Sequence, residues 1–473
     1  MTAENSALPW QAGLATTVAQ EHDAFPGIQG NLPAALRGIL YRNGPGRFEL
    51  GGIRKQHLLD GDGLIQAFEF ADNRVRYRSR FVGTPKYAQE SQAGRFIYPT
   101  WSTLAPGGIL ANLGNRIQCQ AGVTVFSRHG KLFAFDEVAL PFGLDPETLD
   151  TLGPEQIGTA GLKVDYKAHT KTDPRTETWL VLGVEQGVRM HLHLAEHGPD
   201  GRLLRAQCVA APRAAYFHDW FATENHVIVS LQPLQVSLWR FLSGLSSYIG
   251  SMRWRPEQGN LLMVMDRSGA RAPTIIEAPA RFMWHALNAY EHGNTIVADY
   301  VGYEVPDHFI GEDAAFRTIM QGRHGLAQYP GQVRRYLIDL EKKVAREEIV
   351  SPLNHEFPMT CPSTALRRHR YGYFTTAPQT TVFHNGLARI DMQTGERETF
   401  FMGDKVQLGE PIYVAAPDST EEQGWLLSVG LDGDTGKSFL GIFAAHHLPE
   451  GPVAIVHLDH PMPLSFHGTW HKA

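Results

Sequence analysis

Short runs of alternating apolar and polar residues recur along the whole chain and are separated by turns rich in glycine and proline. Residues 74–82 alternate in this way, and residues 178–185, 226–231 and 294–300 are short runs rich in β-branched side chains. Alternation with a period of two predicts half-buried strands, and short β-branched runs predict buried ones. The pattern therefore predicts an all-β protein.

Several of these runs are paired by short turns. Residues 387–401 contain the turn Met392-Gln-Thr-Gly395, and residues 425–444 contain Asp432-Gly-Asp-Thr-Gly436, so both ranges are predicted to be hairpins. Hairpins spaced through 473 residues favour a β-propeller over a two-sheet sandwich. We expect a single propeller domain over residues 1–473.

One segment departs from the strand pattern. Residues 234–249 carry apolar side chains at helical spacing, which predicts an amphipathic helix with Trp239 and Arg240 on it. Such a helix can pack over the core of the sheets, or it can lie in the interface of a membrane. Residues 101–113 are apolar and nearly uncharged, and form a second candidate for membrane contact.

Composition and charge narrow the class of protein. The 43 Lys and Arg against 49 Asp and Glu give a net charge of −6, so nothing in the charge balance attracts nucleic acid. Three widely separated cysteines do not make a disulfide framework and fit a reducing compartment. The pattern at the amino end is not that of a signal peptide, and no run reaches the roughly 18 apolar residues of a membrane span. We expect a cytoplasmic protein, or one that is peripheral on the inner face of a membrane.

Four of the 22 histidines stand out by their surroundings. Each lies in a small or aromatic apolar context at the end of a predicted strand: His169, His218, His285 and His467. One such histidine alone is more often a hydrogen-bonded core residue. Four together fit a propeller in which separate blades each present one imidazole to the axis.

Four neutral imidazoles suit a borderline divalent cation such as iron(II) better than magnesium or calcium. Metal-ligating histidines need carboxylates that accept the second ring N–H and offset the charge of the metal. Glu137, Glu356 and Glu410 are candidates, because each lies in a strand-like or turn context with few charges nearby.

The same residues lie within longer motifs. These include Gly30-Asn-Leu-Pro33, Leu36-Arg-Gly38, Tyr41-Arg-Asn-Gly-Pro-Gly46 and Asp60-Gly-Asp-Gly-Leu64, together with the contexts of the four histidines and three glutamates. With these motifs the chain resembles the carotenoid cleavage oxygenase family over nearly its whole length, and among its members the bacterial apocarotenoid oxygenases.

The resemblance implies a seven-bladed β-propeller with helices and loops capping one face. It implies one iron(II) per chain on the propeller axis, held by His169, His218, His285 and His467, with three of these hydrogen-bonded to Glu137, Glu356 and Glu410. The family inserts dioxygen across a conjugated double bond of a lipophilic polyene and releases two carbonyl products. Apolar patches at the tunnel mouth of family members dock on membranes, a role that residues 101–113 and 234–249 are expected to share.

Residues around the expected metal centre bear on the substrate. Tyr216, Phe217 and Trp284 directly precede two of the four histidines and either line a substrate tunnel or pack around the imidazoles. Val123 stands where many relatives carry a Thr whose methyl crowds the iron, and we expect it to crowd the site in the same way. Asp136 stands where the lignostilbene and isoeugenol branch usually has Lys and the apocarotenoid branch tends to have Trp, which argues against phenolic stilbenes.

The leading hypothesis is therefore an oxidoreductase, an iron-dependent carotenoid or apocarotenoid cleavage dioxygenase with dioxygen as cosubstrate. The alternatives are cleavage of a stilbene or phenylpropenoid olefin, and an isomerase or carrier that binds a polyene without cleaving it.

Overall fold

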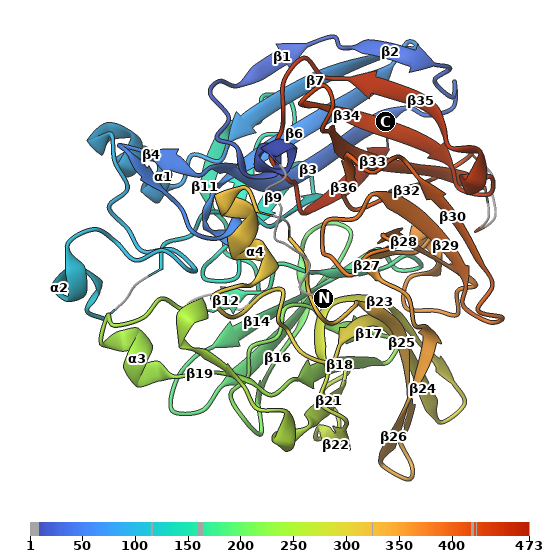
Figure 1. The fold of residues 1–473 in the computed structure, drawn as a ribbon. Coiled ribbons are helices and arrows are strands. Elements are labelled where there is room, and N and C mark those ends of the chain that lie inside the picture. Colours follow the sequence, from blue (N-terminus) through green and yellow to red (C-terminus); the bar gives the residue numbers. More distant parts are fainter. Residues whose placement is uncertain are drawn as a thin grey trace, which may run out of the picture.

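Seven sheets stand around a central axis as the blades of a β-propeller (Figure 1). The computed structural model describes residues 9–114, 117–158, 164–323, 325–417, 421 and 423–472. The predicted all-β, seven-bladed architecture is confirmed. Each blade is an antiparallel sheet whose first or last strand runs beside the axis.

The strands of the first four blades follow one another from the axis outwards. Blade one is β36 (His467–Lys472), β3 (Gly38–Arg47), β6 (Asp62–Ala71), β7 (Arg74–Phe81) and β1 (His22–Ala24). Blade two is β8 (Thr124–Arg128), β9 (Lys131–Phe135), β10 (Phe142–Leu144) and β11 (Thr151–Pro154). Blade three is β12 (Asp165–Tyr166) with β13 (Lys171–Asp173), then β14 (Thr178–Glu185), β15 (His191–His197) and β16 (Leu203–Ala210). Blade four is β17 (Phe221–Ala222), β18 (His226–Leu231), β21 (Asn260–Asp266) and β22 (Thr274–Ala278).

The remaining three blades follow the same plan. Blade five is β23 (Phe282–His292), β24 (Thr295–Tyr303), β25 (Gln332–Asp339) and β26 (Val344–Ser351). Blade six is β27 (His355–Met359), β28 (Tyr371–Thr376), β29 (Gly386–Asp391) and β30 (Arg397–Phe401). Blade seven is β31 (Val406–Leu408) with β32 (Ile412–Ala415), then β33 (Gly424–Asp432), β34 (Lys437–Ala444), β35 (Pro452–His457) and β2 (Gly27–Gly30).

Strands from both ends of the sequence close the ring. β36 pairs antiparallel with β3, so that His467 lies opposite Asn43. β2 pairs with β35 in blade seven, which ties an early segment to a late one a second time. Blade one is therefore complete only when its early and late strands have met.

The hairpins predicted from the sequence are confirmed. β29 and β30 pair across the turn that contains Gly395, and β33 and β34 pair across the turn that contains Gly436. Both glycines have positive φ values, 77° and 67°, a conformation that costs most other residues energy. β14 and β18 have the predicted bounds 178–185 and 226–231.

The helix predicted over residues 234–249 is wrong. The segment begins as β19 (Leu234–Val236), which pairs with β20 (Met252–Trp254), and contains only the short helix α3 (Leu238–Leu242) and a 3-10 turn at Ile249–Ser251. Gly244, at φ 73°, follows α3 and turns the chain away from the helical path. The apolar residues at helical spacing therefore do not share one helix face: some are buried and others are exposed to solvent.

Helices and loops cap one face of the propeller, as expected (Figure 1). The helices are α1 (Pro85–Ala93), α2 (Gly108–Asn112), α3 and α4 (Ala315–Thr318). Among the described residues, no helix has both the length and the apolar character needed to cross a membrane. The largest apolar cluster joins cap residues such as Trp101 and Phe309 to Trp284 and Phe466 of the central segments. The cap is thus packed directly over the axis.

Candidate functional site

Four histidines meet at the propeller axis. His467 opens β36, His169 lies between β12 and β13, His218 precedes β17, and His285 lies within β23. One ligand atom from each lies within 4.8 Å of those of the other three. The Nε2 atoms of His169 and His218 are 3.0 Å apart, and those of His285 and His467 are 3.1 Å apart. Blades one, three, four and five therefore deliver one imidazole each.

Each of the other three blades supplies a glutamate to the outer side of this group. Glu137 follows β9 in blade two, Glu356 lies in β27 of blade six, and Glu410 lies between β31 and β32 of blade seven. Their carboxylate oxygens face the Nδ1 atoms of three of the histidines: 3.0 Å for Glu137 and His218, 2.5 Å for Glu356 and His285, and 2.8 Å for Glu410 and His467. The structure brings together all seven residues singled out in the sequence.

His169 has a different environment. Its Nδ1 lies 4.0 Å from the nearest oxygen of Asp219, which is too far for a hydrogen bond. The Asp219 carboxylate instead pairs with Lys171 Nζ at 2.8 Å and accepts the backbone N–H of Ala286 at 2.9 Å. Asp219 therefore links three of the central segments without binding the imidazole.

Buried cations keep two of the glutamates ionised. Glu410 pairs at 2.7 Å with Arg42, whose side chain is fully buried, and Glu137 pairs at 2.7 Å with Lys167. Glu137 also accepts the hydroxyl of Tyr216 at 2.8 Å. Burial alone would raise the pKa of Glu137, but Lys167 and then His218 outweigh it and hold the pKa at about 2. The carboxylates are thus negative at neutral pH.

The donor set fits a divalent transition metal. Because Glu356 and Glu410 accept the Nδ1 protons of His285 and His467, the Nε2 atoms of these rings carry lone pairs that face each other across 3.1 Å. That arrangement is repulsive unless a cation lies between the rings or one ring takes a second proton. Burial acts to lower the pKa of His285, but Glu356 outweighs it and the pKa is raised. Four converging nitrogen donors suit borderline cations rather than magnesium or calcium.

A small apolar cavity of about 40 Å³ borders the histidines on the cap side. Three of the four imidazoles reach it, and the rest of its wall is apolar except for Glu356. Trp284 forms part of the wall, packs edge-on against His218 with ring centroids 4.8 Å apart, and donates its indole N–H to His308 at 2.5 Å. The wall beside the four imidazoles is therefore partly aromatic, and Trp284 is held in place within it.

The predicted substrate residues fall into separate places. Val123 and Trp284 line the apolar cavity. Tyr216 packs against Trp284, with ring centroids 6.4 Å apart, and is tied to Glu137 by its hydroxyl. Phe217 belongs to the apolar core between blades three and four. Two of these four residues thus face the cavity, while Tyr216 supports its wall.

Asp136 is buried and faces N–H groups. Its carboxylate accepts the backbone N–H of Gln120 at 2.9 Å and of Glu137 at 2.7 Å, and the indole N–H of Trp101 at 3.3 Å. Burial raises its pKa from 3.8 to about 6. A carboxylate already held by three donors serves to fix the loop that carries Glu137.

Protonation of Asp136 is expected to stabilise the fold as pH falls. Since the folded pKa of about 6 exceeds the reference 3.8, the contribution is complete below about pH 4 and is lost as pH rises through about 6. Between about pH 7 and about pH 5, wild type should gain about 1 kcal/mol of unfolding free energy relative to Asp136→Asn. Urea unfolding of both proteins at the two pH values measures this difference. If the unfolding free energies of the two proteins changed by the same amount between these pH values, Asp136 would not be the source of the effect.

The roles of four other residues of the site could not be predicted from the sequence. Arg42, Lys167, Asp219 and His308 are buried and hold the glutamates, the central segments or the aromatic wall. Arg42 lies within the motif Tyr41-Arg-Asn-Gly, but the motif does not show that its guanidinium reaches Glu410, which is 368 positions away. Contacts of this kind depend on how distant blades meet.

Comparison with known proteins gives one consistent result. Residues 15–472 match the model of the retinal pigment epithelial membrane protein family. The chain is 28% identical to an apocarotenoid-15,15'-oxygenase of Synechocystis over 459 residues, covering 94% of this chain and 92% of the relative. It is 29% identical to an isoeugenol monooxygenase of Pseudomonas putida over 461 residues, covering 94% and 93%. The crystal structure of cobalt-substituted Synechocystis apocarotenoid oxygenase superposes with a TM-score of 0.93 at 27% identity, covering 99% of each chain.

Proposed function

Because the chain belongs to the retinal pigment epithelial membrane protein family, that of the carotenoid oxygenases, we propose that it is an iron(II)-dependent dioxygenase acting on a carotenoid or apocarotenoid. It cleaves one conjugated double bond and releases two carbonyl products. The observation that carries the proposal is the convergence of four imidazoles, three of which border an apolar, aromatic cavity.

The chain's own residues divide the work at this centre. The Nε2 atoms of the four histidines hold the metal, and Glu137, Glu356 and Glu410 orient three of the rings and balance its charge from outside. Iron(II), when bound, supplies the activation of dioxygen. Among the described residues the group of converging donors contains imidazoles alone, so these four side chains would be the protein ligands of the metal.

The apolar wall beside the histidines orients the reacting part of the substrate by shape. A polyene has no charged group for a protein to grip, so the walls must decide which double bond approaches the histidines. Val123, Trp284 and Phe316 face the cavity and exclude water from it. Trp284 is held by His308, and this anchor fixes one wall relative to the four imidazoles.

A second candidate is cleavage of a phenylpropenoid olefin, which the similarity to isoeugenol monooxygenase favours. The surroundings of Asp136 disfavour it. A phenol needs a polar partner, whereas the Asp136 carboxylate is already engaged by Gln120, Glu137 and Trp101. Isoeugenol and resveratrol tested beside apocarotenals would separate the two substrate classes.

Oxygen uptake tests the proposed reaction directly. The iron(II)-loaded protein, given an apocarotenal in detergent, is expected to consume one dioxygen per polyene and to release two shorter carbonyl compounds that chromatography resolves. If the polyene is rearranged without oxygen uptake, the protein is an isomerase. If it is bound and returned unchanged, the protein is a carrier, and in either case the dioxygenase proposal fails.

An exposed apolar patch supports docking of the cap on a lipid surface. It is formed by α2 and α3, which lie next to each other at one edge of the molecule (Figure 1) and are joined by the bond from Gly114 N–H to Leu242 O at 2.7 Å. Leu110 is 86% exposed and Trp239 is 66% exposed. The whole patch consists of Ile109, Leu110, Leu113, Leu238, Trp239, Leu242 and Leu245. A contiguous apolar surface of this kind is a place where lipophilic substrates can be collected from a membrane.

Charge on this patch is expected to abolish lipid binding. The double variant Leu110→Glu with Trp239→Glu should lose most of its co-sedimentation with phosphatidylcholine vesicles. Each new glutamate would place a carboxylate against the apolar part of the membrane, which is unfavourable. Turnover of an apocarotenal in detergent should be unchanged. The control is Val188→Glu, an exposed apolar residue outside the patch. Equal sedimentation of all three proteins would contradict lipid docking.

A further inference from the structure

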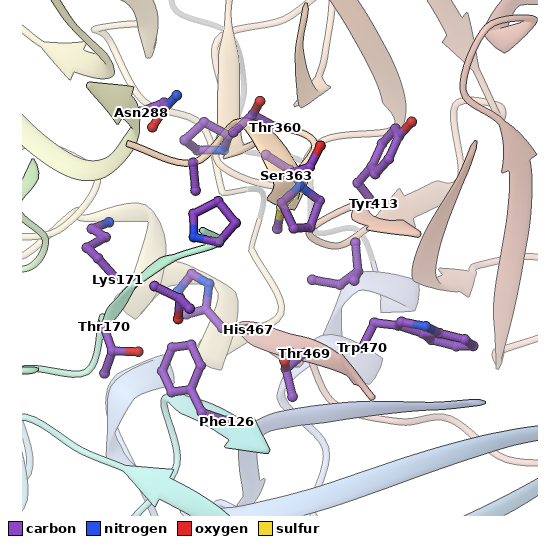
Figure 2. A pocket seen from close by; sticks show the side chains of 18 of the residues that line it. Phe126, Thr170, Lys171, Asn288, Thr360, Ser363, Tyr413, His467, Thr469 and Trp470 are labelled. Carbon is purple, nitrogen blue, oxygen red and sulfur yellow. The ribbon is translucent and has the colours of Figure 1, made fainter. Parts of the chain in front are cut away.

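A second and much larger cavity reaches the histidines from the opposite side. It has a volume of about 620 Å³, and His169, His285 and His467 form its inner end. Figure 2 shows His467 beside Lys171 and Thr170, with Asn288, Thr360 and Ser363 further along the wall. We call it the axial cavity. The function proposed above assigns it no role.

The sequence order of the central segments separates the two cavities. In three segments beside the axis, one residue lines the apolar cavity and a residue one or two positions later lines the axial cavity. These pairs are Val123 and Thr124, Trp284 and Ala286, and Phe466 and Gly468. The four imidazoles lie at this boundary, so the centre can be approached from both sides.

The wall of the axial cavity is suited to water. Lys171, Asp219 and Thr469 are among the residues that line it. Charged and hydroxyl side chains of this kind bind water. The cavity has room for many waters, since one needs only roughly 10–15 Å³. Small polar solutes can therefore reach the histidines along a hydrated path.

A divalent cation needs such a path. Stripping water from an ion without replacing it by ligands is very costly. The apolar cavity has only about 40 Å³ and offers mainly aliphatic and aromatic contacts before the histidines. The axial cavity has about 620 Å³, which leaves room for an ion with its water shell, and its lining includes Lys171, Asp219 and Thr469. The cost of moving the ion is lower on the axial side.

We propose that the metal ion enters and leaves the four-histidine centre through the axial cavity, while the polyene uses the apolar cavity. The proposal rests on the proposed function only in that the four histidines bind a metal. It divides access between the two faces of the propeller, so that metal exchange does not require the cap to open or the substrate to leave.

The charge at the mouth of the axial cavity favours the entry of anions over that of free cations. Arg37 and Lys472 are both exposed there. Arg37 directly precedes β3, and Lys472 pairs with Gly38, the first residue of that strand. Deeper in the cavity, Lys171 is neutralised by Asp219. A cationic mouth attracts small anions and repels free cations. We therefore expect the metal to arrive as an anionic complex with a small carboxylate such as citrate.

Blocking the axial cavity after metal loading tests the route. Thr469 lines its wall (Figure 2), and Thr469→Cys in a Cys208→Ser background offers a thiol there without the exposed native cysteine. The Co²⁺-loaded protein is labelled with a pyrene maleimide or, as a matched control at the same site, with a methylthio group. Release of Co²⁺ into excess EDTA should be slower by about tenfold or more with the bulky label.

A substitution that narrows the apolar cavity provides the complementary test. Val123→Phe narrows the apolar cavity and should leave the release rate unchanged. If the pyrene label has no effect, or if Val123→Phe slows release, the axial route is wrong. A protein that retains no Co²⁺ before labelling would instead refute the metal centre, so the two failures are distinct.

Charge reversal at the mouth tests the carrier. In Arg37→Glu with Lys472→Glu, loading from Co²⁺ citrate should slow by about tenfold and loading from the aqueous ion should accelerate, with both differences shrinking at high salt. Equal rates for wild type and variant from both sources would show that the mouth does not select an anionic complex.

Discussion

Replacement of His285 by Ala is expected to abolish metal retention and turnover. Loss of a group that merely orients a ligand costs about 10–100-fold in metal affinity or activity, and His285 is proposed to be a ligand itself, so the loss should exceed about 100-fold. Its Nε2 lies 3.1 Å from that of His467, and its Nδ1 bonds to Glu356, so no neighbouring group can take its place. Metal content after gel filtration and oxygen uptake measure the two effects.

A matched control separates loss of the centre from loss of a histidine that is merely paired with a carboxylate. His226 begins β18 of blade four and pairs at 2.9 Å with Glu291 of β23, and it is not one of the four histidines that meet at the axis. His226→Ala should therefore keep its metal and its activity. If His285→Ala retained full metal and turnover, the assignment of the four ligands would be wrong.

The second large effect is expected for Glu410→Gln. This change removes the negative charge that pairs with Arg42, whose side chain is fully buried, and leaves an uncompensated guanidinium in the core. Breaking a buried ion pair by removing one partner costs about 3–5 kcal/mol of unfolding free energy. The bond to His467 is also weakened, so metal affinity should fall by about 10–100-fold. Denaturant unfolding of the metal-free protein and metal titration measure the two losses independently.

Removal of the Arg42 cation as well should restore the stability of the fold but not the affinity for the metal. In Arg42→Met with Glu410→Gln the guanidinium is gone, and much of the lost stability should return while metal affinity stays low. Glu291→Gln, which weakens a partly exposed pair with His226, serves as the control and should cost about 1 kcal/mol or less. A Glu410→Gln protein as stable as wild type would show that Arg42 does not depend on this carboxylate.

Local features of the fold could be predicted, and the exceptions have a common cause. Strand alternation and glycine turns act over a few residues, which is why β14, β18 and the hairpin of β29 and β30 match the prediction. The helix over residues 234–249 failed because spacing alone cannot distinguish one continuous apolar face from residues that serve separate contacts. Leu234 is buried beside β20, whereas Trp239 faces solvent.

The same limit applies to the site. The four histidines and three glutamates could be found because each has a recognisable local context, and together they resemble a known family. The partner of Glu410, the spacing of Asp219 from His169, and the bond from Trp284 to His308 are products of tertiary packing. Phe217 directly precedes a histidine, yet it turns into the core between blades, since neighbouring residues of an extended segment point to opposite sides.

The one-residue-per-blade construction also has a consequence for biosynthesis. Every blade gives one histidine or glutamate to the centre, and His467 takes its place only when β36 pairs with β3. Before β36 pairs with β3, at most three of the four imidazoles lie at the axis. Metal capture must therefore follow closure of the ring, and the free energy of metal binding then favours the closed propeller over partly assembled forms. Metal binding is therefore expected to distinguish the closed propeller from forms in which β36 is still unpaired.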